Sequence, residues 1–153
     1  MDEALEETIK ELKRVEHLFY VSLKYTRTVD MIKHMVQRII NLYQYGIQAL
    51  LNHLLEQKKI QSIPTNIAMQ ARTVQEMYPE ELSHHINFYL KLRRVIRAEH
   101  AKREEYRRHV TMIATINNGE IVEVSIDSLK EAYEETIKFV KFLRQVILGE
   151  EEY

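Results

Sequence analysis

Apolar side chains recur every three or four residues along most of this chain, which is the period of an amphipathic helix. The first stretch with this period covers residues 3–26. The second begins at a cap provided by Thr28 or Asp30 and continues to about residue 59. So short a connection predicts that the two long helices form an antiparallel pair. Gly46 in the second helix indicates either a close contact with another helix or a bend.

Two prolines divide the middle of the chain. Pro64 disfavours a helical conformation at the residue before it. A short third helix is therefore predicted after it, capped by Thr65 or Asn66 and ending near residue 77. Pro79 suits the first turn of a fourth helix. Because no strong helix breaker follows between residues 80 and 109, either one helix or two can cover that stretch.

The pattern changes between residues 110 and 126, where β-branched residues stand on both sides of Asn118 and Gly119. An Asn-Gly pair in this setting predicts a two-residue type I′ hairpin turn. With that turn, Ile113 is expected to pair with Val124. A hairpin of only two strands is marginally stable in water, so it must pack on the helices or meet a second copy of the chain.

A last helix is predicted to begin at a cap on Ser125 or Ser128 and to stop at Gly149, with residues 150–153 frayed. Glycine and proline are scarce, and 153 residues suit one domain. The chain is therefore predicted to be a single domain over residues 1–153 with a mostly α fold. That fold is a bundle of about five helices with a short β-hairpin, at about residues 110–126, before the last helix.

Positive charge is concentrated in one segment, since residues 91–109 hold eight of the 22 Lys and Arg residues of a chain whose net charge is −1. A near-neutral chain is not a general nucleic-acid coat, so anion binding has to be local. The absence of cysteine excludes disulfides and thiolate metal sites. We expect no membrane partner and a cytoplasmic location, because the N-terminus lacks a signal-peptide core and no apolar run reaches the roughly 18 residues of a span.

If the fourth helix is continuous, it places basic residues on its inward face. At about 100° per residue, Arg93 and His100 fall in the middle of the apolar face, and Arg107 follows on the same side. Unpaired charges are costly to bury. These groups must therefore form salt bridges with acids such as Glu99 or Glu104, line a wet groove, or face another subunit.

An Arg and a His on one helix face can hold a phosphate and transfer a proton near neutral pH. Such a pair suits RNA cleavage, with the ribose 2′-hydroxyl as the nucleophile. The spacing Arg-x4–6-His occurs three times in the basic segment, as Arg93 with His100, Arg94 with His100, and Arg103 with His109. We prefer Arg93 with His100, because both are predicted to face inward.

This motif, the chain length and the two long opening helices resemble the HEPN superfamily of small helical bundles. Members of that superfamily are commonly dimeric, and many are metal-independent ribonucleases. The resemblance implies a homodimer that acts on RNA or a nucleotide without a cofactor, with Arg93 holding the phosphate and His100 as the acid and base. Further phosphate or nucleic-acid contacts are expected from the other basic residues of the segment, Arg94, Arg97, Arg103, Arg107 and His109.

The sequence suggests three other interpretations. Glu81 and His84 have the spacing of a di-iron carboxylate site, but the sequence has no second Glu-x-x-His, so no metal is expected. Tyr89 or Tyr106 beside the basic segment can stack on a base, although tyrosines at helical spacing mostly pack in a core. The alternative function is a non-enzymatic helical module or homodimer, with an unidentified protein partner, in which the Arg, His and Glu residues form structural salt bridges.

Overall fold

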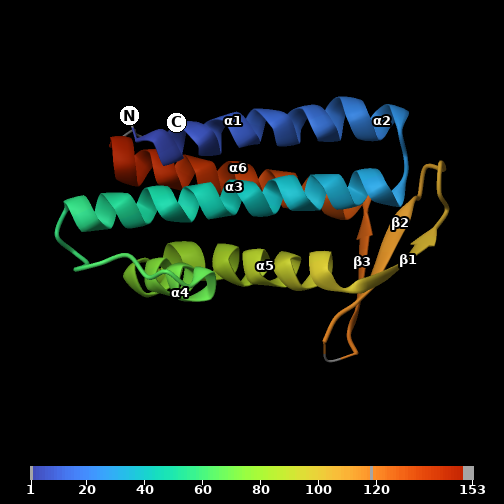
Figure 1. The fold of residues 1–153 in the computed structure, drawn as a ribbon. Coiled ribbons are helices and arrows are strands. Elements are labelled where there is room, and N and C mark those ends of the chain that lie inside the picture. Colours follow the sequence, from blue (N-terminus) through green and yellow to red (C-terminus); the bar gives the residue numbers. More distant parts are fainter. Residues whose placement is uncertain (1, 118, 150–153) are drawn as a thin grey trace.

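The computed structural model describes residues 2–117 and 119–149, and the predicted fraying of residues 150–153 lies outside them. The elements, in chain order, are α1 (Glu3–His17), the π-helical turn η1 (Leu18–Ser22), α2 (Leu23–Tyr25), α3 (Val29–Glu56), α4 (Ile67–Met77), α5 (Pro79–Arg97), β1 (Glu99–Arg103), β2 (Thr111–Thr115), β3 (Ile121–Ser125) and α6 (Ile126–Leu148). The long helices run side by side, and the sheet lies across one end of the bundle (Figure 1). The predicted mostly α fold, with β structure before the last helix, is confirmed. No described helix has both the length and the apolar content to cross a bilayer.

Capping residues set the ends of the helices. The side chain of Thr28 accepts a hydrogen bond from the third residue of α3, and Asn66 does the same for α4. Ser125 and Ser128 exchange hydrogen bonds at the start of α6, so the capping box begins at Ser125. Gly149 ends α6 with a φ of 69°, a left-handed conformation that glycine adopts easily.

The first helix is continuous over the predicted length but not regular. At η1 the backbone N–H of Leu23 donates to the carbonyl of Leu18, five residues earlier. Both side chains are buried. In a regular α-helix a step of five residues would place them about 140° apart, so the wider π turn allows both to face the core. The prediction of a uniform helix over residues 3–26 needs this correction.

The core is centred on α3, which packs against α1, α4, α5 and α6. At Gly46 the backbone of α3 lies so near α6 that a Cβ atom would be only 2.6 Å from Phe139. The ring of Phe139 also stacks on Tyr43, with 4.3 Å between the centroids. Gly46 therefore marks a close helix contact, one of the two possibilities that the sequence left open.

The fourth helix, α5, does not continue to residue 109, so the stretch from residue 80 to residue 109 is not one continuous helix. It ends at Arg97, Ala98 is extended, and Glu99–Arg103 form a third strand that pairs antiparallel with β2. The residues of β1 have no strong strand preference by themselves. A two-stranded hairpin gains stability from a third strand. The pairing with β2 therefore determines the conformation of this segment, although Glu, Ala, Lys and Arg are good helix formers.

The hairpin of β2 and β3 is present, but its register differs by one residue from the prediction. Val124 pairs with Met112 and not with Ile113. The Gly119 N–H donates to the Ile116 carbonyl at 2.8 Å, and the Ile116 N–H donates to the Glu120 carbonyl at 3.0 Å. The loop therefore has three residues where a two-residue turn was expected. A slip of one residue exchanges the two faces of a strand, so Met112 faces the core.

Candidate functional site

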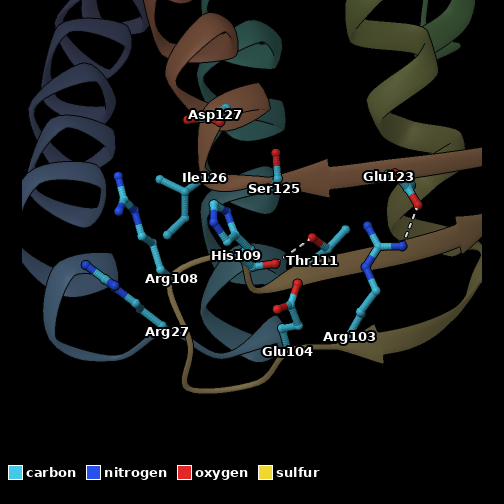
Figure 2. Close-up of a pocket in the computed structure, with 10 residues that line it drawn as sticks. All are labelled: Arg27, Arg103, Glu104, Arg108, His109, Thr111, Glu123, Ser125, Ile126 and Asp127. Atoms are coloured by element: carbon cyan, nitrogen blue, oxygen red, sulfur yellow. Dashed lines mark hydrogen bonds and ion pairs between the residues drawn. The ribbon is translucent and has the colours of Figure 1, made fainter.

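A cavity of about 480 Å³ lies on the face of the sheet that is turned away from the core. On that face Arg103, Thr111 and Ser125 stand in register across the three strands. The cavity is bounded by the sheet, the β1–β2 loop (residues 104–110), the α2–α3 connection and the start of α6 (Figure 2). We call it the basic cavity, and its lining residues are Arg27, Arg103, Glu104, Arg108, His109, Thr111, Glu123, Ser125, Ile126 and Asp127.

The β1–β2 loop is held against the corner where α3 begins. The Glu105 carboxylate accepts a hydrogen bond from the backbone N–H of Val29 at 2.8 Å. The backbone N–H of Tyr106 donates to the Arg27 carbonyl at 2.6 Å. Lys102 lies 3.4 Å from the second oxygen of Glu105. These contacts fix the position of the loop relative to Arg27, which belongs to a distant part of the sequence.

Two residues of the same loop have a left-handed backbone. Glu104 has a φ of 54° and Tyr106 a φ of 65°, values that are uncommon for residues other than glycine. Such conformations cost on the order of 1 kcal/mol or more each, and they tend to occur at functional sites. Here they turn the chain so that Arg108 and His109 point toward the first turn of α6 (Figure 2).

One of the three guanidinium groups in the basic cavity has a carboxylate partner. Arg103 donates to Glu123 at 2.8 Å, and this hydrogen bond lowers the pKa of the Glu123 carboxyl. Among the described residues, no carboxylate forms an ion pair with Arg27, Arg108 or His109. The Nε atom of Arg27 is buried and has no hydrogen-bond partner in the described part of the chain. Two guanidiniums and an imidazole are thus available to a ligand.

The start of α6 adds to the positive potential of the cavity. The backbone N–H groups in the first turn of a helix carry a partial positive charge, which favours anions. α6 has 23 residues, and its cap Ser125 lines the cavity together with the Thr111 hydroxyl. Glu104 and Asp127 bring negative charge to the same lining. The arrangement suits a ligand that has both an anionic group and hydroxyl donors.

The residues predicted from the sequence are divided between several places. Arg103 and His109 lie together in the basic cavity. The five others lie outside its lining: Arg93, Arg94 and Arg97 on the last turns of α5, His100 on β1, and Arg107 in the β1–β2 loop. Because α5 ends before His100, the inference that Arg93 and His100 share one helix face is wrong. The Arg93 guanidinium instead lies 5.9 Å from the ring centroid of Tyr89.

Sequence reasoning missed two basic residues of the cavity. Arg108 is not among the residues that the sequence predicts, because a continuous helix does not place it on the inward face with Arg93 and His100. Arg27 lies in a short connection with no motif around it, and it reaches the cavity through the contact between residues 27 and 106. No local sequence pattern predicts that contact.

The predicted alternatives have partial counterparts in the structure. Lys102 with Glu105, and Arg103 with Glu123, are salt bridges of the kind that the structural interpretation requires. His84 lies 3.5 Å from Glu135. Over residues 2–117 and 119–149, no three His, Asp or Glu side chains are grouped to hold a metal ion. Comparison of the chain with protein-family models, with curated proteins and with solved structures found no match.

Proposed function

We propose that this chain is an HEPN-like helical protein that binds RNA or a nucleotide through a phosphate group in the basic cavity. The observation that carries the proposal is the convergence of Arg27, Arg108 and His109, without carboxylate partners in the described structure, on the positive end of α6. Guanidinium groups bind phosphate through paired hydrogen bonds, and helix N-termini favour phosphate for the same electrostatic reason.

The acids of the cavity favour a nucleotide over a simple inorganic anion. The carboxylates of Glu104 and Asp127 accept hydrogen bonds but repel anions, so they select for a ligand that also carries hydroxyl groups. Ribose offers such donors next to its phosphate, and the 2′-hydroxyl is the group by which proteins distinguish RNA from DNA. We place the phosphate near Arg27 and Arg108, and the ribose near the carboxylates.

The enzymatic form of the proposal is metal-independent RNA cleavage. Arg103 and His109 form one of the three Arg-x4–6-His matches, and this match lies in the basic cavity. In this scheme the guanidinium groups hold the scissile phosphate while the 2′-hydroxyl attacks it. His109 takes the proton of the 2′-hydroxyl and delivers it to the departing 5′-oxygen, which leaves a 2′,3′-cyclic phosphate. The pair first preferred, Arg93 with His100, remains a proposal for a separate site, with His100 on β1 as the acid and base.

A second candidate function is structural, and the edge strand β1 favours it. Four of its five side chains are exposed, and β2 is its neighbour on one side only. If two copies pair antiparallel about Ala101, Glu99 of each lies opposite Arg103 of the other. Opposite charges directly across two strands stabilise such pairing. The protein is then a non-enzymatic homodimer in which the basic residues form salt bridges.

Binding of a fluorescent single-stranded RNA, followed by anisotropy over a salt series with EDTA present, tests the first candidate. Arg108→Gln should weaken binding and reduce the slope of log K against log salt by about 1. The matched control is Lys13→Gln, which removes a charge from a separate basic hollow between α1 and α3. No salt-dependent binding by the wild type, or equal losses in both variants, contradicts the proposal.

The same samples test cleavage. His109→Ala should remove any EDTA-resistant cleavage by the wild type. Cleavage that disappears in His100→Ala but persists in His109→Ala assigns the chemistry to the Arg93 and His100 pair instead. For the structural candidate, sedimentation should show a dimer that Glu99→Lys separates and that Glu99→Lys with Arg103→Glu restores. A wild type that is monomeric at every concentration contradicts that candidate.

A further inference from the structure

A second, smaller cavity adjoins the basic cavity. It has a volume of about 200 Å³, and we call it the aromatic cavity. Its lining residues are Phe19, Tyr20, Leu23, Lys24, Arg27 and Ile126. Arg27 and Ile126 line both cavities. The two hollows are therefore neighbours that meet at one guanidinium group and one aliphatic side chain.

The aromatic cavity is built by the π-helical turn η1. Phe19 and Tyr20 both belong to this turn, and Leu23 follows it directly. π-helical turns are rare and are found frequently at functional sites. Here the wider turn buries Leu18 and Leu23 while Tyr20 stays 56% exposed beside them. The irregularity of the first helix thus leaves an aromatic ring at the surface, at the edge of a hollow.

The exposed ring of Tyr20 contacts two other aromatic rings. The centroid of Tyr20 lies 5.0 Å from that of Phe19 and 5.8 Å from that of Tyr133, both in edge-to-face geometry. Phe19 and Tyr133 in turn stack at 5.9 Å. Such contacts restrain the orientation of each ring. A preorganised aromatic surface loses less entropy when a flat ligand binds to it.

We infer that the aromatic cavity is a nucleobase site for the nucleotide whose phosphate occupies the basic cavity, an inference that rests on the proposed function. Unpaired bases bind proteins by stacking on aromatic side chains and on Arg guanidinium planes. Tyr20 and Phe19 supply the aromatic surface. Arg27 supplies the guanidinium plane, at the junction with the phosphate site. Lys24 can donate a hydrogen bond to a carbonyl or ring nitrogen at the rim.

This arrangement narrows the ligand class to a nucleotide unit with an unpaired base. A base within a duplex is stacked on both faces and cannot enter a lined hollow. A plain anion such as inorganic phosphate has no group for the aromatic cavity, and a purely apolar ligand gains nothing from Arg27 and Lys24 at its edge. We therefore assign single-stranded RNA or a free nucleotide, and not double-stranded RNA.

The test compares adenosine 5′-monophosphate with ribose 5-phosphate, which has the same phosphate and sugar but no base. Binding of each to the intact chain is measured by isothermal titration calorimetry with EDTA present. The wild type should bind the nucleotide about 5- to 150-fold more tightly, the range expected for one stacked base. Tyr20→Leu should remove most of this preference and leave ribose 5-phosphate binding unchanged.

Two further variants separate the possible outcomes. Tyr25→Leu is the matched control, because Tyr25 is 79% exposed at the end of the same helix but does not line the aromatic cavity. It should keep the preference for the nucleotide. Arg108→Gln should weaken both ligands by the same factor. Melting curves of Tyr25→Leu and Arg108→Gln should match the wild type, since these side chains are exposed. Tyr20→Leu should melt slightly lower, because it loses the ring contacts with Phe19 and Tyr133.

The outcomes distinguish this inference from the proposal on which it rests. If the wild type binds both ligands equally, or if Tyr20→Leu and Tyr25→Leu reduce the preference alike, the nucleobase site is wrong and phosphate binding stands. If the wild type binds neither ligand and no single-stranded RNA, both are wrong. A preference lost only in Tyr20→Leu supports the nucleobase site.

Discussion

The carboxylate of Glu105 accepts a hydrogen bond from the backbone N–H of Val29, 76 residues earlier in the chain, at a distance of 2.8 Å. Val29 is the first residue of α3, where backbone N–H groups have no partner within the helix. A carboxylate there satisfies one donor and also lies at the positive end of the helix dipole. Together with the hydrogen bond from the Tyr106 N–H to the Arg27 carbonyl, this contact joins the β1–β2 loop to the opening helices and brings Arg108 and His109 to the side of Arg27.

Replacing Glu105 should therefore loosen the basic cavity as well as the fold. We expect Glu105→Ala to lower the free energy of unfolding by about 1–2 kcal/mol, the usual cost of losing a helix cap. Urea denaturation measures this loss, and amide hydrogen exchange should quicken within residues 104–109. Glu134→Ala removes an exposed carboxylate of α6 and should change neither. If amide hydrogen exchange in residues 104–109 is unchanged in Glu105→Ala, the hydrogen bond between Glu105 and Val29 does not hold the loop in place.

The register of the sheet can be checked with adjacent residues of β2. Met112 is 1% exposed and faces the core, whereas Ile113 pairs with Glu123 on the face turned away from it. Met112→Lys should be destabilising by several kcal/mol, since it buries an unpaired charge. Ile113→Lys should be tolerated much better, because Glu123 lies opposite the new charge. Thermal melts of the two variants measure the difference, and the reverse ranking would support the register that the sequence predicted.

Space between α3 and α6 is limiting at Gly46. A Cβ atom there would lie 2.6 Å from Phe139 and 2.9 Å from Leu143, well inside contact distance. We expect Gly46→Ala to destabilise the protein by about 1–3 kcal/mol through overpacking, despite the better helix propensity of alanine. Chemical denaturation measures the change. Adding Phe139→Leu should recover part of the loss if the clash is its cause, and purely additive losses would exclude that cause.

His85 gives the stability a defined pH dependence. Burial lowers the pKa of its imidazole, whose Nδ1 lies 3.1 Å from the Tyr43 hydroxyl. The unfolded chain takes up a proton near the ordinary value of about 6.5, while the folded chain takes it up only at lower pH. The free energy of unfolding should therefore fall as the pH decreases through about 6.5, by up to about 1.4 kcal/mol per pH unit, and level off below the folded pKa.

Denaturation of wild type and His85→Leu across this pH range tests the assignment. In the variant, the free energy of unfolding should change less steeply with pH. The difference corresponds to the uptake of up to one proton on unfolding, because the variant has no imidazole to titrate at this position. His53→Leu, which replaces a histidine at the end of α3, serves as the control. Equal slopes in wild type and His85→Leu would place the titration elsewhere.

The sequence predicted those parts of the fold that depend on local patterns. Apolar periodicity located the long helices, and side-chain chemistry located their caps at Thr28, Asn66 and Ser125. It could not predict β1, because Glu99–Arg103 contains helix formers and becomes a strand only through pairing with β2. The hairpin register was off by one because Asn-Gly fits two-residue and three-residue loops alike.

The candidate site was harder to predict than the helices, because it is formed by contacts between residues that are distant in the sequence. Arg103 and His109 match the motif in the sequence, but a continuous fourth helix would favour Arg93 with His100. The chain instead leaves the helix at Arg97 and forms a strand from Glu99. Arg27 joins the cavity only because Tyr106 and Glu105 attach the β1–β2 loop to the start of α3.

The most direct test of the central claim is a two-dimensional amide NMR titration of the isotopically labelled protein with adenosine 5′-monophosphate. Binding in the basic cavity should shift the amide signals of residues 103–111 and 125–127, together with that of Arg27. Signals around Lys13 and His34, which line the separate basic hollow, should not move. Shifts confined to that hollow or to Arg93 and His100, or no shifts at any ligand concentration, would contradict phosphate binding in the basic cavity.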